Sequence, residues 1–353
     1  MKKLISLLLV LAMALTLVAC GGTTEAPAAT EAPAAEAPAA APEAPAAEVT
    51  TYDVGVAIYQ YNDNFMTLYR QEIEAYFKTL ETDTVKYNIT MVDSKNDMAE
   101  QTNQIDTFIT QGMDVIILNL VQTSSAEVLI DKVVDAGIPL ILINREPLGE
   151  TDESYPGIIN NPGVCYVGAD ARQSGTYQGE IVLALDDKGD VNGNGKVDYV
   201  MIIGDPENPD AQYRTEFSIK ALTDAGVEVN KLVDNVGNWD QTKGQEIAAA
   251  ALAQFGDEID VIFCNNDGMA LGAAAAIEAA GRKVGEDIYL LGVDALDECQ
   301  EMVQAGTMTG TVLNDHIGQS HAAVDAAVAA LNGEALQNYY WVDYVKVDAN
   351  YFG

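Results

Sequence analysis

Amide and carboxylate side chains follow six predicted strands of this 353-residue chain, at the point where each strand ends. The strand ends that carry these Asn and Asp residues are residues 59–65, 144–146, 204–210, 265–267, 294–295 and 314–315. An Asn side chain donates and accepts hydrogen bonds, an Asp side chain accepts them, and the nearby Arg214 donates in a planar fork. This mixture suits a ligand whose hydroxyl groups both donate and accept, such as a sugar ring.

Two aromatic residues near these strand ends could contact the apolar face of such a ring. Phe65 follows the first strand end, and Trp239 lies in the segment 236–240. The C–H faces of a sugar are apolar and stack on aromatic rings. Either residue alone is more often part of a core, and Asn or Asp after a single strand is more often a helix cap. Six such ends in one chain, together with an Arg and a Trp, favour a binding site.

Short β-branched runs alternate with amphipathic segments of helical length from residue 52 onward. The predicted strands are 52–59, 87–92, 114–118, 139–143, 199–203, 260–263, 288–292 and 310–313. The predicted helices are 65–80, 98–111, 124–136, 170–186, 210–225, 241–255, 268–281, 296–305 and 316–331. This alternation predicts parallel sheets with helices on both faces. Right-handed connections then bring the strand ends to one edge, where α/β proteins bind ligands.

The chain begins with an export signal. Lys2 and Lys3 precede an apolar run from Leu4 to Leu17 that is too short to span a bilayer. The following segment, 17–21, resembles the lipobox of bacterial lipoproteins, in which Cys20 would be acylated and become the mature N-terminus. We therefore expect a signal peptide over residues 1–19 and an extracytoplasmic protein held to the membrane by a lipid anchor. An ordinary cleaved signal is the alternative.

Residues 20–50 consist almost entirely of Ala, Pro, Glu and Thr. A segment with so few large apolar residues cannot offset its ordering entropy, so we expect a disordered linker that separates the folded part from the membrane. The folded part follows from residue 51.

Composition excludes several classes of function. The chain has 54 acidic residues against 18 Lys and Arg, a formal net charge of −36, which disfavours binding to nucleic acid. Besides Cys20 it has Cys165, Cys264 and Cys299, which we expect to be buried and unpaired. Zinc is not expected, because there is no CxxC motif and only two histidines are present.

Several motifs in the folded part resemble the periplasmic glucose/galactose-binding proteins of ABC importers. The motifs are residues 59–66, 208–211 with Arg214, 265–270, 292–296 and 310–315, and the resemblance runs from residue 52 to about residue 345. It implies a ring sandwiched between Phe65 and Trp239. It further implies hydrogen bonds from Asp63, Asn144, Asn208, Asp210, Arg214, Asn266, Asp294 and Asn314. The family usually has His at the position of Asn208, so glucose, galactose and xylose all remain open as ligands.

The resemblance also implies the type 1 periplasmic-binding-protein fold, an α/β architecture of two doubly wound parallel-sheet lobes joined by three crossing strands. The crossings are expected near residues 168, 314 and 343. The N-terminal lobe would comprise residues 51–168 and 315–342, and the C-terminal lobe residues 169–314 and 343–353. A neutral monosaccharide would bind between the lobes, which would close on it and present a surface to the ABC permease.

A second motif predicts a structural calcium site. Residues 190–198 place oxygen ligands at the spacing of an EF-hand loop, with Gly195 at its sharp turn, but Met201 stands where the loop's final Glu would be. The resemblance implies that Asp260 supplies the missing ligand. The predicted Ca²⁺ ligands are therefore Asp190, Asn192, Asn194, Lys196 through its carbonyl, Asp198 and Asp260. A plain Asn-Gly loop without metal is the alternative.

Other functions fit the residues less well. A glycosidase needs paired carboxylates, which are easily found among 54 acids, but no nucleophile–base arrangement accompanies them. A transcriptional regulator of the same fold needs a basic DNA-binding head where this chain has its leader and acidic linker. A chemoreceptor ligand would use the same site as a transport receptor, so that alternative stays open. We expect a monomeric binding protein that is not an enzyme.

Overall fold

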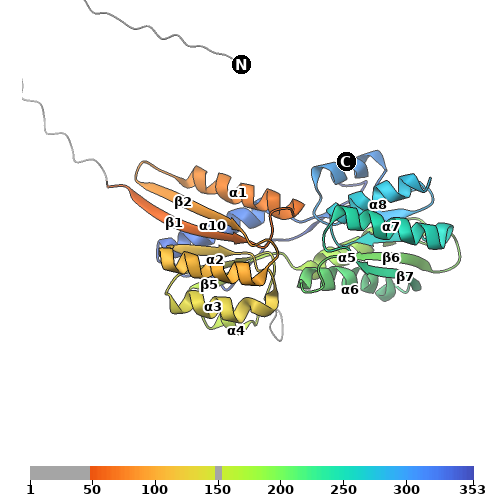
Figure 1. The fold of residues 1–353 in the computed structure, drawn as a ribbon. Helices are drawn as coiled ribbons and strands as arrows, with labels where there is room; N and C mark the ends of the chain where they lie inside the picture. Colours follow the sequence, from red (N-terminus) through yellow and green to blue (C-terminus); the bar gives the residue numbers. More distant parts are fainter. Residues whose placement is uncertain (1–47, 148–152) are drawn as a thin grey trace, which may run out of the picture. The chain divides into compact units, whose positions relative to one another are not determined.

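Aliphatic and β-branched runs form two separate parallel sheets in the computed structural model of the chain, which describes residues 48–147 and 153–353 (Figure 1). The signal peptide, Cys20 and nearly all of the linker lie outside the described residues. Within the described residues, no helix has the length and apolar character needed to cross a membrane.

The first sheet has six strands, all parallel, in the order β11-β5-β4-β3-β1-β2. These strands are β1 (Thr50–Ile58), β2 (Val85–Asp93), β3 (Val115–Leu118), β4 (Leu140–Ile143), β5 (Val164–Gly168) and β11 (Tyr339–Trp341). Helices α1 (Asn64–Leu80) and α10 (His316–Leu331) pack on one face. Helices α2 (Met98–Gln111), α3 (Ala126–Asp135) and α4 (Pro156–Ile159) pack on the other, and a single 3₁₀ turn (Thr123–Ser125) precedes α3.

The second sheet has four parallel strands in the order β7-β6-β8-β9. They are β6 (Val197–Ile203), β7 (Val229–Val236), β8 (Val261–Cys264) and β9 (Tyr289–Leu291). Isolated parallel bridges join β9 to the segment of β10 (Thr311–Leu313), and β12 (Val345–Val347) pairs antiparallel with β10. Helices α7 (Gln241–Phe255), α8 (Asp267–Ala279) and α9 (Asp297–Ala305) cover one face, with a 3₁₀ turn (Gly256–Glu258) after α7. Helices α5 (Ala171–Leu183) and α6 (Pro209–Asp224) cover the other.

Each sheet thus has a hydrophobic core on both of its faces, and the two sheets define two lobes. The chain passes between the lobes three times: after β5, between β10 and α10, and between β11 and β12. The predicted fold class of two doubly wound parallel-sheet lobes is confirmed. The antiparallel strand β12 at the edge of the second sheet is a feature that the alternating pattern did not predict.

All predicted strands and helices are present within a few residues of their expected bounds, and four further strands, β5, β7, β11 and β12, are present as well. Cys165, Cys264 and Cys299 are buried and unpaired, as expected. Helices begin at the strand ends because Asp or Asn side chains cap them, for example Asp97 at α2 and Asp240 at α7. This arrangement gathers polar side chains at the carboxyl edges of both sheets.

Candidate binding site

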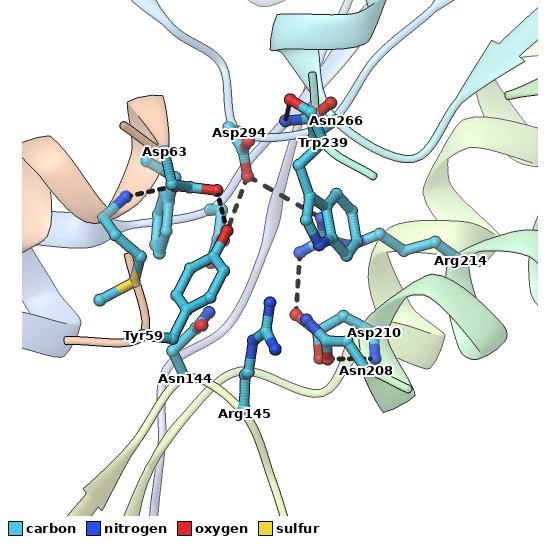
Figure 2. A pocket seen from close by; sticks show the side chains of 13 residues that line it. Tyr59, Asp63, Asn144, Arg145, Asn208, Asp210, Arg214, Trp239, Asn266 and Asp294 are labelled. Carbon is cyan, nitrogen blue, oxygen red and sulfur yellow. Dashed lines mark hydrogen bonds and ion pairs between the residues drawn. The ribbon is translucent and has the colours of Figure 1, made fainter. Parts of the chain in front are cut away.

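One cavity between the lobes is lined by all ten residues that the sequence predicted for a sugar site (Figure 2). They are Asp63, Phe65, Asn144, Asn208, Asp210, Arg214, Trp239, Asn266, Asp294 and Asn314. Tyr59, Met66 and Arg145 complete the lining.

Both sheets contribute to the cavity from the carboxyl ends of their strands. The first lobe supplies the segment after β1, the start of α1 and the two residues after β4. The second lobe supplies residues after β6, β7, β8 and β9, and Asn314 lies at the second crossing. A ligand in this cavity would therefore contact both lobes at once.

Three of the lining residues also cap helices. Asp63 accepts a hydrogen bond from the Met66 backbone N–H at 2.7 Å, and Asn208 accepts one from the Asp210 N–H at 3.0 Å. Asn266 caps α8 in the same way, since its Oδ1 accepts from the Met269 N–H at 3.0 Å. Capping uses the amide oxygen and leaves the NH₂ group, so the Asn side chains can act as donors toward a ligand.

Three other lining residues have backbone conformations that favour glycine. The φ angles are 61° at Asn144, 66° at Trp239 and 121° at Asp294. Such conformations cost about 1–3 kcal/mol each and gather at functional sites. The Trp239 ring also requires Gly204, because a Cβ atom there would lie 2.2 Å from the indole Cη2. The backbone around the cavity is therefore held in place by the rest of the fold.

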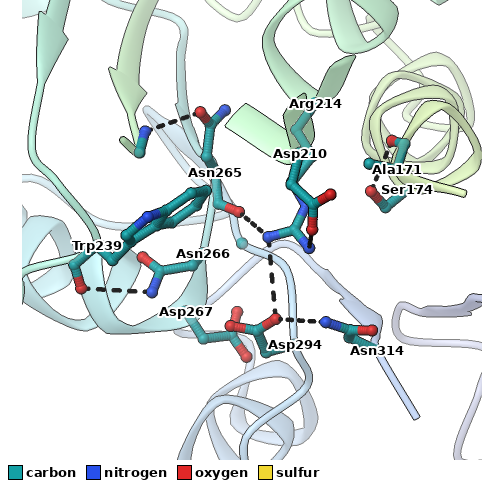
Figure 3. A network of polar contacts seen from close by, with 12 residues as sticks. Ala171, Ser174, Asp210, Arg214, Trp239, Asn265, Asn266, Asp267, Asp294 and Asn314 are labelled. Carbon is teal, nitrogen blue, oxygen red and sulfur yellow. Dashed lines mark hydrogen bonds and ion pairs between the residues drawn. The ribbon is translucent and has the colours of Figure 1, made fainter. Parts of the chain in front are cut away.

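Arg214 is the centre of a buried polar network (Figure 3). Its Nη1 donates to the Asn265 carbonyl at 2.8 Å, and its Nη2 donates to Asp210 Oδ2 at 3.1 Å and to the Tyr344 hydroxyl at 3.0 Å. Asp294 Oδ1 lies 4.0 Å from Nη1. Only 3% of Arg214 is exposed, so this guanidinium depends on its protein partners for compensation.

Burial raises the pKa of two acids of the cavity, Asp294 and Asp210. Burial raises the pKa of Asp294 well above its usual value, although Arg214 opposes the shift. The pKa of Asp210 is also raised by burial, against the opposing charges of Arg214 and Arg145. Asp294 Oδ1 accepts from the Asn314 side chain at 3.3 Å, and Asp63 Oδ2 accepts from the Tyr59 hydroxyl at 2.7 Å. The cavity thus offers donors and acceptors already fixed in position by the protein.

Tyr59, Met66 and Arg145 line the cavity but were not predicted from the sequence. Arg145 is 1% exposed, and its guanidinium carbon lies 3.7 Å from the centroid of the Tyr59 ring. Its Nη1 donates to the Val121 carbonyl and lies 3.2 Å from Asp205 Oδ2 of the second lobe. Arg145 directly follows Asn144, so its position at a strand end was the available signal.

The predicted calcium loop is closed by its own hydrogen bonds. Asp190 accepts from the backbone N–H groups of Asn194 and Gly195 at 3.0 and 2.9 Å. Asp260 accepts from the N–H groups of Asn192 and Asp198 at 2.9 and 2.8 Å, which ties the loop to the start of β8. The predicted ligand segments therefore lie together.

The donor set of this loop fits a hard cation, since it consists of carboxylate, amide and carbonyl oxygens. Burial raises the pKa of Asp260 to about 6, and the neighbouring Asp198 and Asp190 add to the shift. A cation would relieve this repulsion. Two observations weigh against the metal. The Lys196 ammonium lies 3.0 Å from Asp198, and within residues 48–147 and 153–353 no three His, Cys, Asp or Glu side chains are grouped to hold a metal ion.

The comparisons with known proteins all match periplasmic binding proteins. A model of the periplasmic binding protein domain matches residues 54–335. The D-galactose/methyl-galactoside binding periplasmic protein of Haemophilus influenzae is 32% identical over 317 residues, which cover 85% of this chain and 90% of that protein. The ribose import binding protein of Salmonella typhimurium is 25% identical over 265 residues, 74% of this chain and 81% of that protein.

The fold has close structural relatives as well. The crystal structure of an ABC transporter solute binding protein from Bacillus halodurans with bound myo-inositol matches with a TM-score of 0.72 and 28% sequence identity. The match covers 85% of this chain and 95% of that one.

The buried carboxyl group of Glu146, two residues after Asn144, predicts a pH dependence of stability. Burial raises its pKa from 4.5 to about 7, and the nearby Arg172 opposes the shift. Between pH 4.5 and about 7, Glu146 keeps its proton in the folded protein but releases it in the unfolded chain. The contribution of Glu146 to the free energy of unfolding therefore falls as pH rises. We expect Glu146→Gln to gain stability over the wild type progressively from pH 4.5 to 7. Denaturant unfolding of both proteins across that range measures the difference, and a difference independent of pH would contradict the assignment.

Proposed function

Since the chain belongs to the periplasmic binding protein family, we propose that it is the extracytoplasmic receptor of an ABC sugar importer. Its ligand would be a neutral pyranose similar to glucose or galactose, delivered to the permease without chemical change. The observation that carries the proposal is the single cavity in which all ten predicted residues meet. The relatives named above bind D-galactose, methyl-galactoside, ribose and myo-inositol, which are all uncharged and rich in hydroxyl groups.

The chemistry of the cavity supports a neutral hydroxylated ligand. The amide NH₂ group of Asn208 remains as a donor after capping, and that of Asn266 keeps one hydrogen because the other is donated to the Trp239 carbonyl at 3.4 Å, while Asp63 and Asp294 present acceptors. Two further donors, Arg214 Nε and Trp239 Nε1, are buried without a hydrogen-bond partner. A buried polar group without a partner costs about 1–3 kcal/mol, which a ligand hydroxyl would recover.

Binding and lobe closure would be coupled through this cavity. A ring held between Phe65 of the first lobe and Trp239 of the second would be desolvated on both faces only when the lobes are closed. The three crossings are then the hinge about which the lobes move. Contacts between the lobes, such as Thr123 Oγ1 to the Glu207 carbonyl at 3.4 Å, would complete the surface that the permease recognises.

Transport rather than catalysis is the better account of these residues. None of the residues that line the cavity within the described part of the chain is a Ser, Cys or His, the usual nucleophiles and bases. The carboxylates Asp63, Asp210 and Asp294 each have fixed hydrogen-bond or ion-pair partners. Such acids are suited to holding hydroxyl groups in place.

We also propose that Ca²⁺ occupies the loop 190–198. Asp190, Asn192, Asn194, Asp198, Asp260 and the Lys196 carbonyl would hold it. The ion would neutralise the acids and tie the loop between α5 and β6 to β8, a structural role away from the cavity.

At the N-terminus, we propose that Cys20 is acylated and holds the protein at the outer face of the cytoplasmic membrane or in the periplasm. The support is the sequence pattern of residues 1–21.

The stacking role of Trp239 can be tested by calorimetry against neutral monosaccharides. We expect Trp239→Ala to weaken sugar binding by at least about 2 kcal/mol, roughly 30-fold in Kd, because an aromatic face of the site is lost. Trp239→Phe is the matched control, since it keeps an aromatic ring and should retain most of the affinity. Equal affinity of the wild type and Trp239→Ala would reject the proposed ring position.

Chelation tests the metal. If Ca²⁺ fills the loop, EDTA should lower the melting temperature and added Ca²⁺ should restore it, because bound metal stabilises only the folded state. An ion present at 100 times its Kd contributes about 2.7 kcal/mol. Asp190→Asn should melt lower than the wild type and no longer respond to EDTA. A wild-type melting curve that EDTA leaves unchanged would mean that the Lys196 ammonium and backbone hydrogen bonds close the loop without metal.

Lipid attachment can be measured in a bacterial host. We expect the full-length protein to incorporate labelled fatty acid and to fractionate with membranes. Cys20→Ser should lose the label and appear in the soluble fraction, while Cys299→Ser, at a buried cysteine, should keep the label. Membrane association of Cys20→Ser without label would instead indicate a retained signal sequence.

A further inference from the structure

A second cavity shares three walls with the sugar cavity. Tyr59, Arg145 and Trp239 line both, and Asp205, the partner of Arg145 in the second lobe, lines only the outer one. Arg145 thus stands at the boundary between two adjoining spaces.

The walls of the outer cavity are almost entirely polar. Apart from Tyr59 and Trp239, they consist of charged and amide side chains. The amides come from both lobes: Gln60, Asn62 and Asn96 from the first and Asn238 from the second. Amides that donate and accept suit a group rich in hydroxyls.

The charges of the outer cavity are balanced. Asp205 and Asp240 oppose Arg145 and Lys243, so the walls carry two acids and two bases. A strongly charged group would meet repulsion from one pair or the other. This balance favours a neutral occupant.

Arg145 has hydrogen-bonding capacity that the protein does not use. Its Nη1 is occupied by the Val121 carbonyl and Asp205, but its Nε and Nη2 are buried with no partner. In Figure 2 its side chain extends between Tyr59 on one side and Asn208 and Asp210 on the other. An oxygen atom of a ligand that passes from the inner to the outer cavity would accept from these donors.

We propose that the outer cavity is a second subsite, which receives the second ring of a neutral disaccharide whose first ring fills the inner cavity. Arg145 would donate to oxygen atoms at the linkage between the rings. The inference rests on the proposed sugar-binding function and extends it from monosaccharides to glycosides. The other possible occupant of the outer cavity is solvent alone.

Calorimetry with mono- and disaccharides tests the subsite. The probes are D-galactose and D-glucose, with lactose and melibiose as galactosides and cellobiose and maltose as glucosides. If D-galactose or D-glucose binds, we expect at least one of the disaccharides that contain that monosaccharide to bind as well. Asn62→Tyr, which fills part of the outer cavity from an exposed turn, should weaken that disaccharide by at least about tenfold and change the monosaccharide by less than about twofold.

Matched variants separate the subsite from general effects. Asn103→Tyr makes the same change at an exposed position of α2 outside both cavities and should alter neither affinity. Lys243→Ala removes a charged side chain from the wall of the outer cavity without adding bulk, and it should lower the affinity for the disaccharide only. Lys283→Ala, an exposed position on the same lobe, should change neither affinity.

Each outcome decides one proposal. Monosaccharide binding with no disaccharide bound, or a disaccharide affinity that Asn62→Tyr and Lys243→Ala leave unchanged, would overturn the second subsite and leave the sugar receptor intact. If none of the six sugars binds, the proposed ligand class fails and the subsite fails with it.

Discussion

The buried guanidinium of Arg214 is the constraint on which the arrangement of the site depends. A charge removed from water must be compensated by hydrogen bonds and opposite charges, and here the compensation comes from four different segments. Asp210 belongs to the same helix, Asn265 follows β8, Asp294 follows β9, and Tyr344 lies on the third crossing between the lobes. Removal of any one partner would leave the charge less well satisfied. The network therefore fixes the strand ends relative to one another, and it connects the cavity to a segment that the lobes share.

The residues that cap helices in this fold also line the proposed binding cavity. Asp63, Asn208 and Asn266 each satisfy the backbone of a helix with one oxygen and also line the cavity. The cap is therefore observed at these positions, and the same side chains line the cavity that we propose binds the ligand. Asn144, Trp239 and Asp294 lie instead in strained backbone conformations, which persist because strands and buried contacts on either side hold them.

The carboxyl ends of parallel strands meet at one edge, and this rule predicted that the Asn and Asp residues at the strand ends lie together, whereas the family resemblance supplied the individual residues of the inner cavity. That rule needs only the order of strands and the residues after them. The alternating pattern did not identify β5, β7, β11 or β12, and among these β7 is an edge strand whose partly exposed residues lack an apolar run. Arg145 was missed for a different reason. Its role arises from Tyr59, Val121 and Asp205, which are distant in sequence and meet only in the folded chain.

The position of Arg145 also bears on how the two lobes recognise a ligand together. The inner cavity is bounded by a network internal to the second lobe, centred on Arg214, and by a residue of the first lobe whose ion pair crosses to Asp205. In the proposed receptor, closure around a ligand would bring a second guanidinium against the ring, in addition to the aromatic faces. This guanidinium is nearly fully buried, and its Nε and Nη2 have no hydrogen-bond partner. Hydroxyl or ether oxygens of the ligand would supply the missing acceptors, so ligand binding and lobe closure would depend on the same hydrogen bonds.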